Sequence, residues 1–293
     1  MPGSDASISG LAFLTEPGVH PPCILDVGGA ALSTDHAALD GDIPPALSVG
    51  LVLRSLAVHF TVWILVVIFG TTCILLSLFT RGQIVFWLGR LWGIIILKVA
   101  GVELEVHGLE RFPPGEPHVL VGNHTSNFDI YAMIPALGNR YYRFLTKREV
   151  LYLPIFGWAL WAGGFPLIDR RDNAKARKTM KKLAERMRRT GLSLLAFPEG
   201  TRNHTDLLLM PFKKGPFIVA AEVGVPILSF VIHGARQVQG RHEYLVHPGT
   251  IRVEFLEPIS VTGRSYQDRD DLKLKARTAI EAALLRGPSG DGL

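Results

Sequence analysis

The chain has 293 residues, of which 48% are hydrophobic and 19% are charged. Globular domains typically contain about 50–250 residues, so this length accommodates one such domain with an appendage and excludes a fusion of two enzymes. A charged fraction below the usual ~25%, together with so many hydrophobic residues, indicates that part of the chain contacts a lipid bilayer. The two cysteines cannot form a disulfide framework, and no group of cysteines and histidines has the spacing of a metal site.

Charge is unevenly distributed along the chain. Residues 1–53 contain six acidic residues and no Lys or Arg, so the remaining residues carry +11 to give the net charge of +5. A basic body indicates anionic partners, which are nucleic acid, acidic lipid headgroups or phosphorylated substrates. The chain has no recognised nucleic-acid-binding motif, so we do not expect a nucleic-acid partner.

The first segment, 1–45, is rich in Gly, Pro, Ala and Asp and shows no sustained period of two or 3.6 residues. This composition predicts a disordered acidic arm. A secretory signal would have a basic start and an apolar core, and an organellar transit peptide would be rich in arginine. The arm has neither composition.

The second segment, 46–100, has the composition of a membrane anchor. Residues 60–79 contain no charged side chain, and at ~1.5 Å per residue such a helix spans the ~30 Å hydrocarbon core. We therefore expect a membrane-embedded helix over 56–79, followed by an interfacial or second helix over 84–99. A single crossing and a hairpin that enters one leaflet remain alternatives.

Basic residues flank the anchor asymmetrically. Arg81, Arg90 and Lys98 follow the start of the apolar run, whereas only Arg54 precedes it. Because positively charged flanks favour the cytoplasmic side, the rest of the chain is expected on the cytoplasmic face of the membrane.

The third segment, 101–293, alternates between strand-like and helix-like patterns, which predicts an α/β fold with a central mixed sheet covered by helices. Strands are expected at 102–107, 118–122, 164–168, 193–197, 227–232 and 251–256, and helices at 173–189, 215–223 and 268–286. The stretch 170–189 contains ten Lys or Arg residues. Such a face is either simply solvated or contacts anionic lipid or an acidic partner.

A polar segment at 123–129 directly follows one predicted strand and contains His124 and Asp129. A histidine can accept a proton at neutral pH, and a carboxylate can orient it. Positions five apart on a regular helix point ~140° away from each other. The two side chains can therefore meet only if the segment begins as a turn and the helix starts near Phe128. Taken alone, the segment is also compatible with a turn that only caps a helix.

A second polar turn, Glu199-Gly200-Thr201-Arg202, follows another predicted strand. Glycine allows a tight turn beside a ligand, and arginine presents a planar cation that matches phosphate oxygens. Two such turns at strand ends, in order and downstream of an apolar helix, are a more specific signal of a functional site than either turn alone.

Four blocks in order resemble those of the glycerophospholipid acyltransferase family, specifically its 1-acylglycerol-3-phosphate (lysophosphatidic acid) acyltransferase branch. They are NHTSNFD at 123–129, GGFPLIDRR at 163–171, FPEGTR at 197–202 and VGVPILSF at 223–230. The resemblance extends over residues 100 to 260. One departure is Pro166-Leu167, which stands where many members carry a bulky residue before Ile-Asp-Arg.

The resemblance implies roles for individual residues. His124 would be the general base and Asp129 its orienting partner, and no acyl-enzyme would form. The substrate-binding residues implied are Lys147, Arg170, Arg171, Glu199, Gly200, Thr201 and Arg202. No metal or cofactor is implied beyond the acyl thioester, which is acyl-CoA or acyl carrier protein as co-substrate.

The expected reaction is acyl transfer to the free hydroxyl of lysophosphatidic acid, which forms phosphatidic acid, a step of phospholipid biosynthesis at a membrane. One alternative is another lysolipid acceptor, such as lyso-ornithine lipid. An alternative from another class is a non-catalytic membrane module that binds anionic lipid; it would explain the anchor and the charge but not the spacing of His124 and Asp129.

Overall fold

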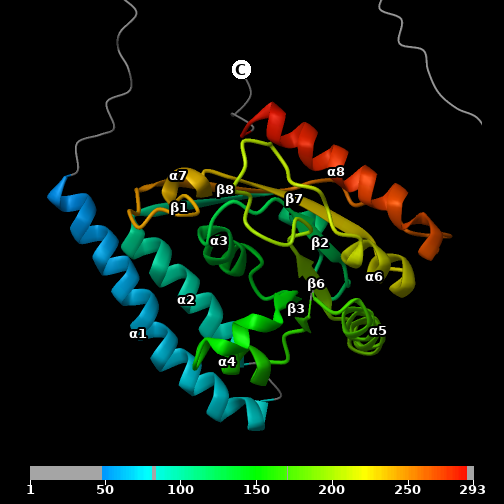
Figure 1. The fold of residues 1–293 in the computed structure, drawn as a ribbon, viewed down its shortest axis with the longest axis horizontal. Helices are drawn as coiled ribbons and strands as arrows, with labels where there is room; N and C mark the ends of the chain where they lie inside the picture. The colour runs from blue at the N-terminus through cyan, green and yellow to red at the C-terminus, as the bar shows by residue number, and fades with distance from the viewer. Residues whose placement is uncertain (1–47, 81–83, 170, 289–293) are drawn as a thin grey trace, which may run out of the picture. The chain divides into compact units, whose positions relative to one another are not determined.

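The structure is a computed structural model that describes residues 48–80, 84–169 and 171–288 (Figure 1). The arm predicted at 1–45 lies outside these residues. The expected α/β class is confirmed, because a mixed sheet lies between two groups of helices.

The sheet has six strands in the order β1-β8-β7-β2-β6-β3. Neighbouring strands are parallel except for β7 and β8, which are antiparallel. The strands are β1 (Val102–His107), β2 (Val119–Gly122), β3 (Tyr142–Phe144), β6 (Ser193–Ala196), β7 (Ile227–His233) and β8 (Gly249–Phe255). Five of these lie where the sequence predicts strands.

Two hydrophobic layers cover the sheet because successive side chains of a strand point to opposite faces. In β2, Leu120 belongs to the layer that includes the helices α1, α2 and α3, whereas Val119 and Val121 belong to the layer of α5, α6 and α8. These helices are α1 (Val49–Thr80), α2 (Ile84–Ala100), α3 (Phe128–Ala136), α5 (Asn173–Thr190), α6 (Gly215–Val223) and α8 (Arg269–Arg286). β2, buried from both sides, is thereby fixed in the middle of the fold.

Helix α1 begins earlier than predicted, at Val49, and among the described helices it alone is long and apolar enough to cross a membrane. It packs against α2 and against the short helix α4 (Phe156–Ala162). Its outward side chains form an exposed apolar face that includes Leu53, Leu56, Phe60, Trp63 and Val67. Its inward face enters the core through Val58 and Leu65.

The sequence predicts a strand over residues 164–168, but these residues do not form a strand of the main sheet. Only β5 (Leu167–Ile168) is extended, and it pairs with β4 (Thr146–Lys147) in a separate two-stranded sheet. Gly164 has a φ of +71° and Pro166 has no N–H to donate, so the segment cannot continue a regular ladder. The 3-10 helix η2 (Arg148–Tyr152) connects β4 to α4. The remaining short helices are η1 (Leu109–Arg111), α7 (Ala235–Val238) and η3 (Tyr266–Asp268).

Candidate active site

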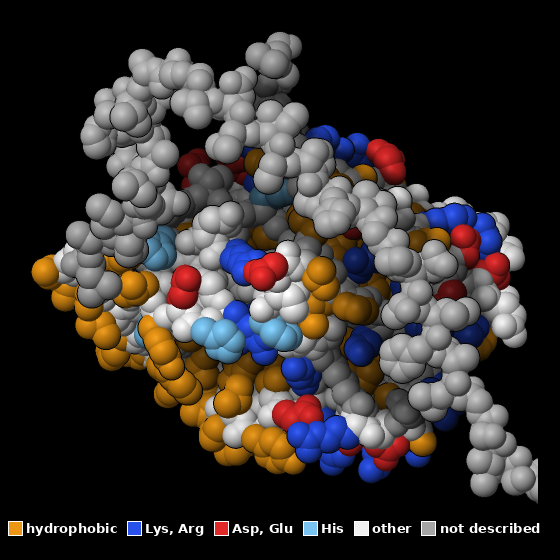
Figure 2. Space-filling model, turned by 45° about the horizontal axis from the view of Figure 1, so that its top comes forward, with side chains coloured by type: hydrophobic (Ala, Val, Ile, Leu, Met, Phe, Trp, Pro, Cys, Tyr) orange, Lys and Arg blue, Asp and Glu red, His pale blue; other side chains and the backbone are white. Residues whose placement is uncertain are grey.

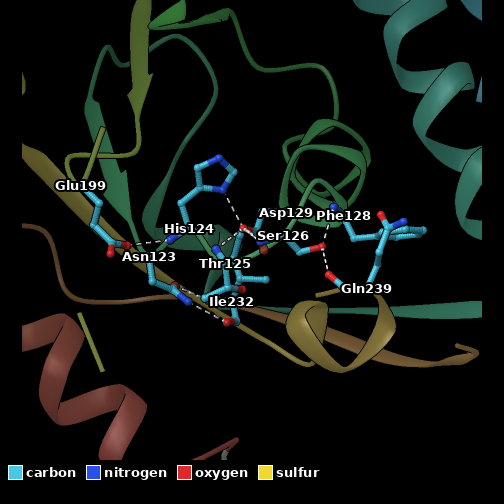
Figure 3. A network of polar contacts seen from close by, with 9 residues as sticks. All are labelled: Asn123, His124, Thr125, Ser126, Phe128, Asp129, Glu199, Ile232 and Gln239. Carbon is cyan, nitrogen blue, oxygen red and sulfur yellow. Dashed lines mark hydrogen bonds and ion pairs between the residues drawn. The ribbon is translucent and has the colours of Figure 1, made fainter. Parts of the chain in front are cut away.

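His124 and Asp129 meet in the turn that joins β2 to α3 (Figure 3). Nδ1 of His124 lies 2.7 Å from Oδ2 of Asp129. The backbone N–H groups of Thr125 and Ser126 donate to the same oxygen, at 2.7 and 2.9 Å. Because the helix starts at Phe128, the predicted geometry of a turn followed by a helix is confirmed.

This hydrogen bond fixes the tautomer of the histidine. The Asp129 side chain is fully buried, and that of His124 is 13% exposed. A carboxylate that accepts three hydrogen bonds requires Nδ1 of His124 to carry the hydrogen, which leaves Nε2 with a free lone pair. His124 lines a cavity of about 500 Å³. The arrangement therefore provides a proton acceptor at the cavity surface.

Further hydrogen bonds hold the turn in place. The Oγ of Ser126 accepts from the N–H of Phe128 at 3.1 Å and donates to the carbonyl of Gln239 at 2.7 Å. The side chain of Asn123 donates to the carbonyl of Ile232 and accepts from its N–H. β7 and the end of α7 thus position the turn from outside.

Glu199 connects the second polar turn to His124. Its side chain is buried, with Oε1 accepting from the N–H of His124 and Oε2 from the N–H of Met210, each at 2.9 Å. Burial raises the pKa of Glu199, although both N–H groups favour its ionised form. Both carboxylate oxygens face the protein rather than the cavity. The ring of Phe197, in the same turn, stacks on the His124 ring with 4.1 Å between centroids.

Cations line the cavity near His124. Lys147 stands at the end of β4, Arg202 follows the tight turn at Gly200, where φ is +81°, and Arg241 comes from the loop after α7. Burial lowers the pKa of Arg202, and the neighbouring Arg241 lowers it further. Within the described part of the chain, neither arginine side chain forms an ion pair, although the charge of Asp129 acts on Arg202, so the pair presents positive charge suited to an anion.

The cavity has a volume of about 500 Å³ and is called the active-site cavity below. Its polar lining includes His124, Asn127, Thr146, Gly200, Thr201 and the three cations, and most of the other lining side chains are apolar. These walls come from both predicted anchor helices as well as from α3 and α4, and include Leu65, Val66, Phe69, Cys73, Val85, Trp92, Ile134 and Phe156. The anchor helices are therefore part of the site as well as of the anchor.

Two expected binding residues are not found in the cavity lining, one of them because it is not described. Arg170 is outside the described residues. Arg171 is 88% exposed, does not line the active-site cavity and has its Nε 3.8 Å from Oε1 of Glu149. A role for Arg171 in binding the acceptor stays a prediction, which this position does not favour. In the described residues no group of three or more His, Cys, Asp or Glu side chains could hold a metal ion.

Comparison with known proteins decides the family. Residues 103–233 match the family model described as Acyltransferase. The chain is 34% identical to 1-acyl-sn-glycerol-3-phosphate acyltransferase alpha of Mus musculus over 194 residues, 66% of this chain and 67% of that protein. It is 30% identical to the 1-acyl-sn-glycerol-3-phosphate acyltransferase of Haemophilus influenzae over 204 residues, covering 68% of this chain and 80% of that protein. The chain belongs to the acyltransferase family, in its 1-acylglycerol-3-phosphate O-acyltransferase branch.

The fold of this acyltransferase is similar to a solved structure. The crystal structure of the 1-acyl-sn-glycerophosphate (LPA) acyltransferase from Thermotoga maritima aligns with a TM-score of 0.68 at 19% identity. The alignment covers 82% of this chain and 98% of that one, so it extends well beyond the region that the family model matches.

The sequence of the acyltransferase gave no signal for two features of the site. Arg241 stands alone in a loop, with no motif around it. The apolar walls from α1 and α2 have the same composition as lipid-facing residues, so only packing distinguishes Leu65 and Trp92 from the exposed Trp63.

Proposed function

We propose that this acyltransferase moves a fatty acyl chain from an acyl thioester to the free hydroxyl of lysophosphatidic acid, forming phosphatidic acid. The observation that carries the proposal is the position of His124, which pairs with Asp129 through Nδ1 and lines a cavity together with Lys147, Arg202, Arg241 and many apolar side chains. An acceptor with a phosphate, a hydroxyl and an acyl chain matches this combination of groups. The names of the relatives above agree with this substrate.

In the proposed mechanism Nε2 of His124 takes the proton of the acceptor hydroxyl as its oxygen attacks the thioester carbonyl. The new C–O bond gives a tetrahedral intermediate, and its collapse breaks the C–S bond. The leaving thiolate then takes the proton back from the imidazolium. Asp129 stabilises that imidazolium and keeps the ring oriented.

The reaction needs no acyl-enzyme, because the base acts directly on the acceptor. Cys73 also lines the cavity, but it stands on α1 among apolar side chains, and no hydrogen bond joins it to a base within the described residues. A thiol without a base is a weak nucleophile. We expect Cys73→Ala to retain turnover.

Lys147, Arg202 and Arg241 are proposed to hold the acceptor phosphate. A guanidinium can give two parallel hydrogen bonds to phosphate oxygens, and the ammonium of Lys147 adds a third cation. Glu199 is proposed to keep the loop that carries Arg202 in contact with the backbone of His124. Both acyl-CoA and acyl carrier protein are acidic, so the basic body suits either donor.

Membrane attachment is proposed to occur through the outer face of α1 together with α2. The Oγ of Ser55 accepts a hydrogen bond from the N–H of Val246 at 2.9 Å, and Gly70 lies against Ile155. A helix held against the body at both places does not project away from it, so we favour a hairpin in one leaflet over a crossing. The body is then expected on the cytoplasmic face, where the acyl donors are available.

The test is acyl transfer by the purified protein in detergent, with lysophosphatidic acid and a panel of other lysolipids as acceptors, and with acyl-CoA and acyl carrier protein as donors. We expect phosphatidic acid from the wild type and none from His124→Ala. If Arg202→Ala retains the turnover that His124→Ala loses, the acceptor carries no phosphate. Folded protein that yields no product with any acceptor would leave only lipid binding as its function.

A further inference from the structure

A second hollow, of about 310 Å³, lies behind the wall of the active-site cavity. Its lining is Arg148, Leu151, Trp161, Leu167, Asp169, Lys175, Lys178, Thr179 and Lys182, and we call it the basic hollow. The segment from β4 through η2 to α4 forms the wall between the active-site cavity and the basic hollow, because neighbouring residues of this segment line one or the other. Lys147 lines the active-site cavity and Arg148 the basic hollow, and Leu160 and Trp161 divide in the same way.

The basic hollow has an excess of positive charge. Four cations and one carboxylate line it. Nη1 of Arg148 lies 3.1 Å from Oδ2 of Asp169, and Nζ of Lys175 lies 3.0 Å from Oδ2 of Asp172, outside the lining. Among the described residues, the side chains of Lys178 and Lys182 form neither a hydrogen bond nor an ion pair. Two exposed ammonium groups one helical turn apart on α5 are therefore available to a single anionic group.

Exposed aromatic side chains stand beside the basic hollow. Tyr152 is 82% exposed, Trp158 51% and Trp161 68%, and the neighbouring Leu153 is 49% exposed. All four belong to the short segment from η2 to α4. Exposed Trp and Tyr side chains are typical of the boundary between a membrane and water, where one end of the ring is apolar and the other is hydrated.

The aromatic segment continues the apolar face of α1. α4 packs against α1, with Ile155 at its start lying against Gly70. Figure 2 shows hydrophobic side chains gathered along the lower left flank of the molecule, with Lys and Arg side chains beside them where that flank ends. Apolar, aromatic and basic groups thus follow one another in the order that a leaflet presents acyl chains, interface and headgroups.

We propose that the basic hollow binds the headgroup of an anionic phospholipid in the membrane to which the enzyme is attached. Lys178 and Lys182 contact the phosphodiester, and Trp161 lies at the level of the interface. The proposal deepens the proposed function and rests on its membrane attachment, but it does not depend on acyl transfer. Continuity with the exposed face of α1 favours a lipid over a soluble polyanion.

The experiment measures lipid preference with the full chain in non-ionic detergent micelles. Energy transfer from tryptophan to dansyl-labelled phosphatidylglycerol is compared with transfer to dansyl-labelled phosphatidylcholine, because Trp161 lines the basic hollow. A basic residue near an anionic lipid surface changes binding about fivefold, so Lys178→Ala/Lys182→Ala should lower the preference for phosphatidylglycerol by roughly 30-fold. Raising the salt concentration should weaken the wild-type preference.

The matched control is Arg177→Ala/Lys181→Ala. Arg177 and Lys181 are exposed on the same helix and have the same spacing as Lys178 and Lys182, but neither lines the basic hollow. The control substitution therefore removes the same amount of charge from outside the hollow. We expect the control to keep most of the preference. An equal loss in the control, or an unchanged preference in Lys178→Ala/Lys182→Ala, would overturn the proposal.

A kinetic measurement separates the lipid from the acyl donor. If the basic hollow instead binds the phosphates of coenzyme A, Lys178→Ala/Lys182→Ala would raise the KM for acyl-CoA several-fold in micelles to which no anionic lipid except the acceptor is added, and the proposal would be wrong. An unchanged KM together with the lost lipid preference supports it. If every protein, wild type included, lacks turnover, the proposed acyl transfer is refuted, whereas the lipid preference still decides the role of the hollow.

Discussion

At the scale of single residues, Oδ2 of Asp129 has two roles. It accepts from the backbone N–H groups of Thr125 and Ser126, which shapes the turn, and it accepts from Nδ1 of His124, which orients the ring. The first role requires only an acceptor oxygen, whereas stabilising an imidazolium requires a negative charge. A substitution that keeps the oxygen and removes the charge separates the two.

Asp129→Asn should therefore leave the fold intact and lower kcat by about 10²–10⁴-fold, because the amide oxygen still accepts N–H groups but cannot balance the charge on His124. The measurement is steady-state kinetics together with the thermal unfolding temperature. His124→Ala is the reference for complete loss of the base. A variant with near wild-type kcat would contradict the role assigned to Asp129.

Glu199 is proposed as a positioning residue, since its two carboxylate oxygens accept from the N–H groups of His124 and Met210. In Glu199→Gln the amide nitrogen cannot accept, so one buried N–H loses its partner at a cost of about 1–3 kcal/mol. A small displacement of a base lowers turnover by up to about 10²-fold, so we expect kcat to fall by 10- to 100-fold with a lower unfolding temperature.

The control for this substitution is Glu222→Gln, which makes the same chemical change on an exposed side chain of α6. It should change neither kcat nor the unfolding temperature. If Glu199→Gln lowers only the unfolding temperature and leaves kcat intact, Glu199 stabilises the loop without positioning His124.

At the scale of elements, the close approach of α2 to α3 depends on Gly93. A Cβ placed there would lie 2.8 Å from the carbonyl oxygen of Tyr131 and 3.0 Å from Cδ of Pro135. Gly93→Ala should therefore separate the helices and destabilise the protein by about 1–3 kcal/mol. A Cβ placed at Gly89, one turn earlier, would have as its nearest neighbour the Cγ2 methyl group of Ile134, at 3.9 Å.

Gly89→Ala is the matched control and should stabilise slightly, by about 0.5–1 kcal/mol, because alanine is the better helix former. Thermal unfolding in detergent measures both variants. Equal shifts in the two unfolding temperatures would show that the close approach is not tight in solution.

The pairing of β1 with β8 includes an ion pair that predicts a dependence on pH. Glu105 stands opposite Arg252, with 2.6 Å between Oε2 and Nε, and this hydrogen bond lowers the pKa of Glu105. A carboxyl group whose pKa is lower in the folded state than in the unfolded state stabilises the folded protein at pH values above the unfolded pKa. This stabilisation is lost as the pH falls through the folded pKa. Arg252→Gln should thus lower the unfolding temperature at about pH 7, and the difference from the wild type should shrink as the pH falls below the ordinary pKa of a glutamate. A difference that is constant with pH would assign the effect to packing.

Much of the fold was predictable at this scale because long apolar runs carry a clear period. The strands at β1, β7 and β8 and the helices α5, α6 and α8 lie close to where the sequence predicts them. β3 and β4 were not predicted, since they are short and contain Arg143 and Lys147, which are typical of loops. Arg143 is buried because its guanidinium stacks on Phe86 and donates to the carbonyl of Gly163, contacts that only tertiary structure supplies.

The site was predictable to the extent that its chemistry is local. His124 and Asp129 are five residues apart, so geometry alone required a turn between them, and the structure contains it. Arg241 comes from a distant loop, and Arg171 is exposed and does not line the cavity. Neither could follow from spacing along the chain.

At the scale of the whole molecule, α1 has two different faces. One face carries Val58, Leu65 and Val66 into the core and the cavity wall, whereas the other exposes Phe60, Trp63 and several aliphatic side chains. A soluble protein rarely leaves so continuous an apolar surface uncovered. The two faces can therefore be tested separately, because the outer side chains contribute little to the core.

Replacing Phe60, Trp63 and Val67 together with serine should release the enzyme from membranes while its body stays folded. These side chains are 68%, 65% and 48% exposed, and each large apolar side chain transferred to lipid contributes about 2 kcal/mol. The fraction that remains in the pellet after a carbonate wash of membranes should therefore fall steeply.

The matched control replaces Tyr244, Leu274 and Leu285 with serine, because they are also large and exposed, at 83%, 60% and 74%, but lie far along the chain in a loop and on α8. This control should remain in the pellet like the wild type. If the α1 variant also remains there, lipid is held by another surface, and the aromatic segment of η2 and α4 becomes the first to test. If the α1 variant is released but still acylates lysophosphatidic acid dissolved in detergent, the outer face serves attachment and the inner face serves the reaction.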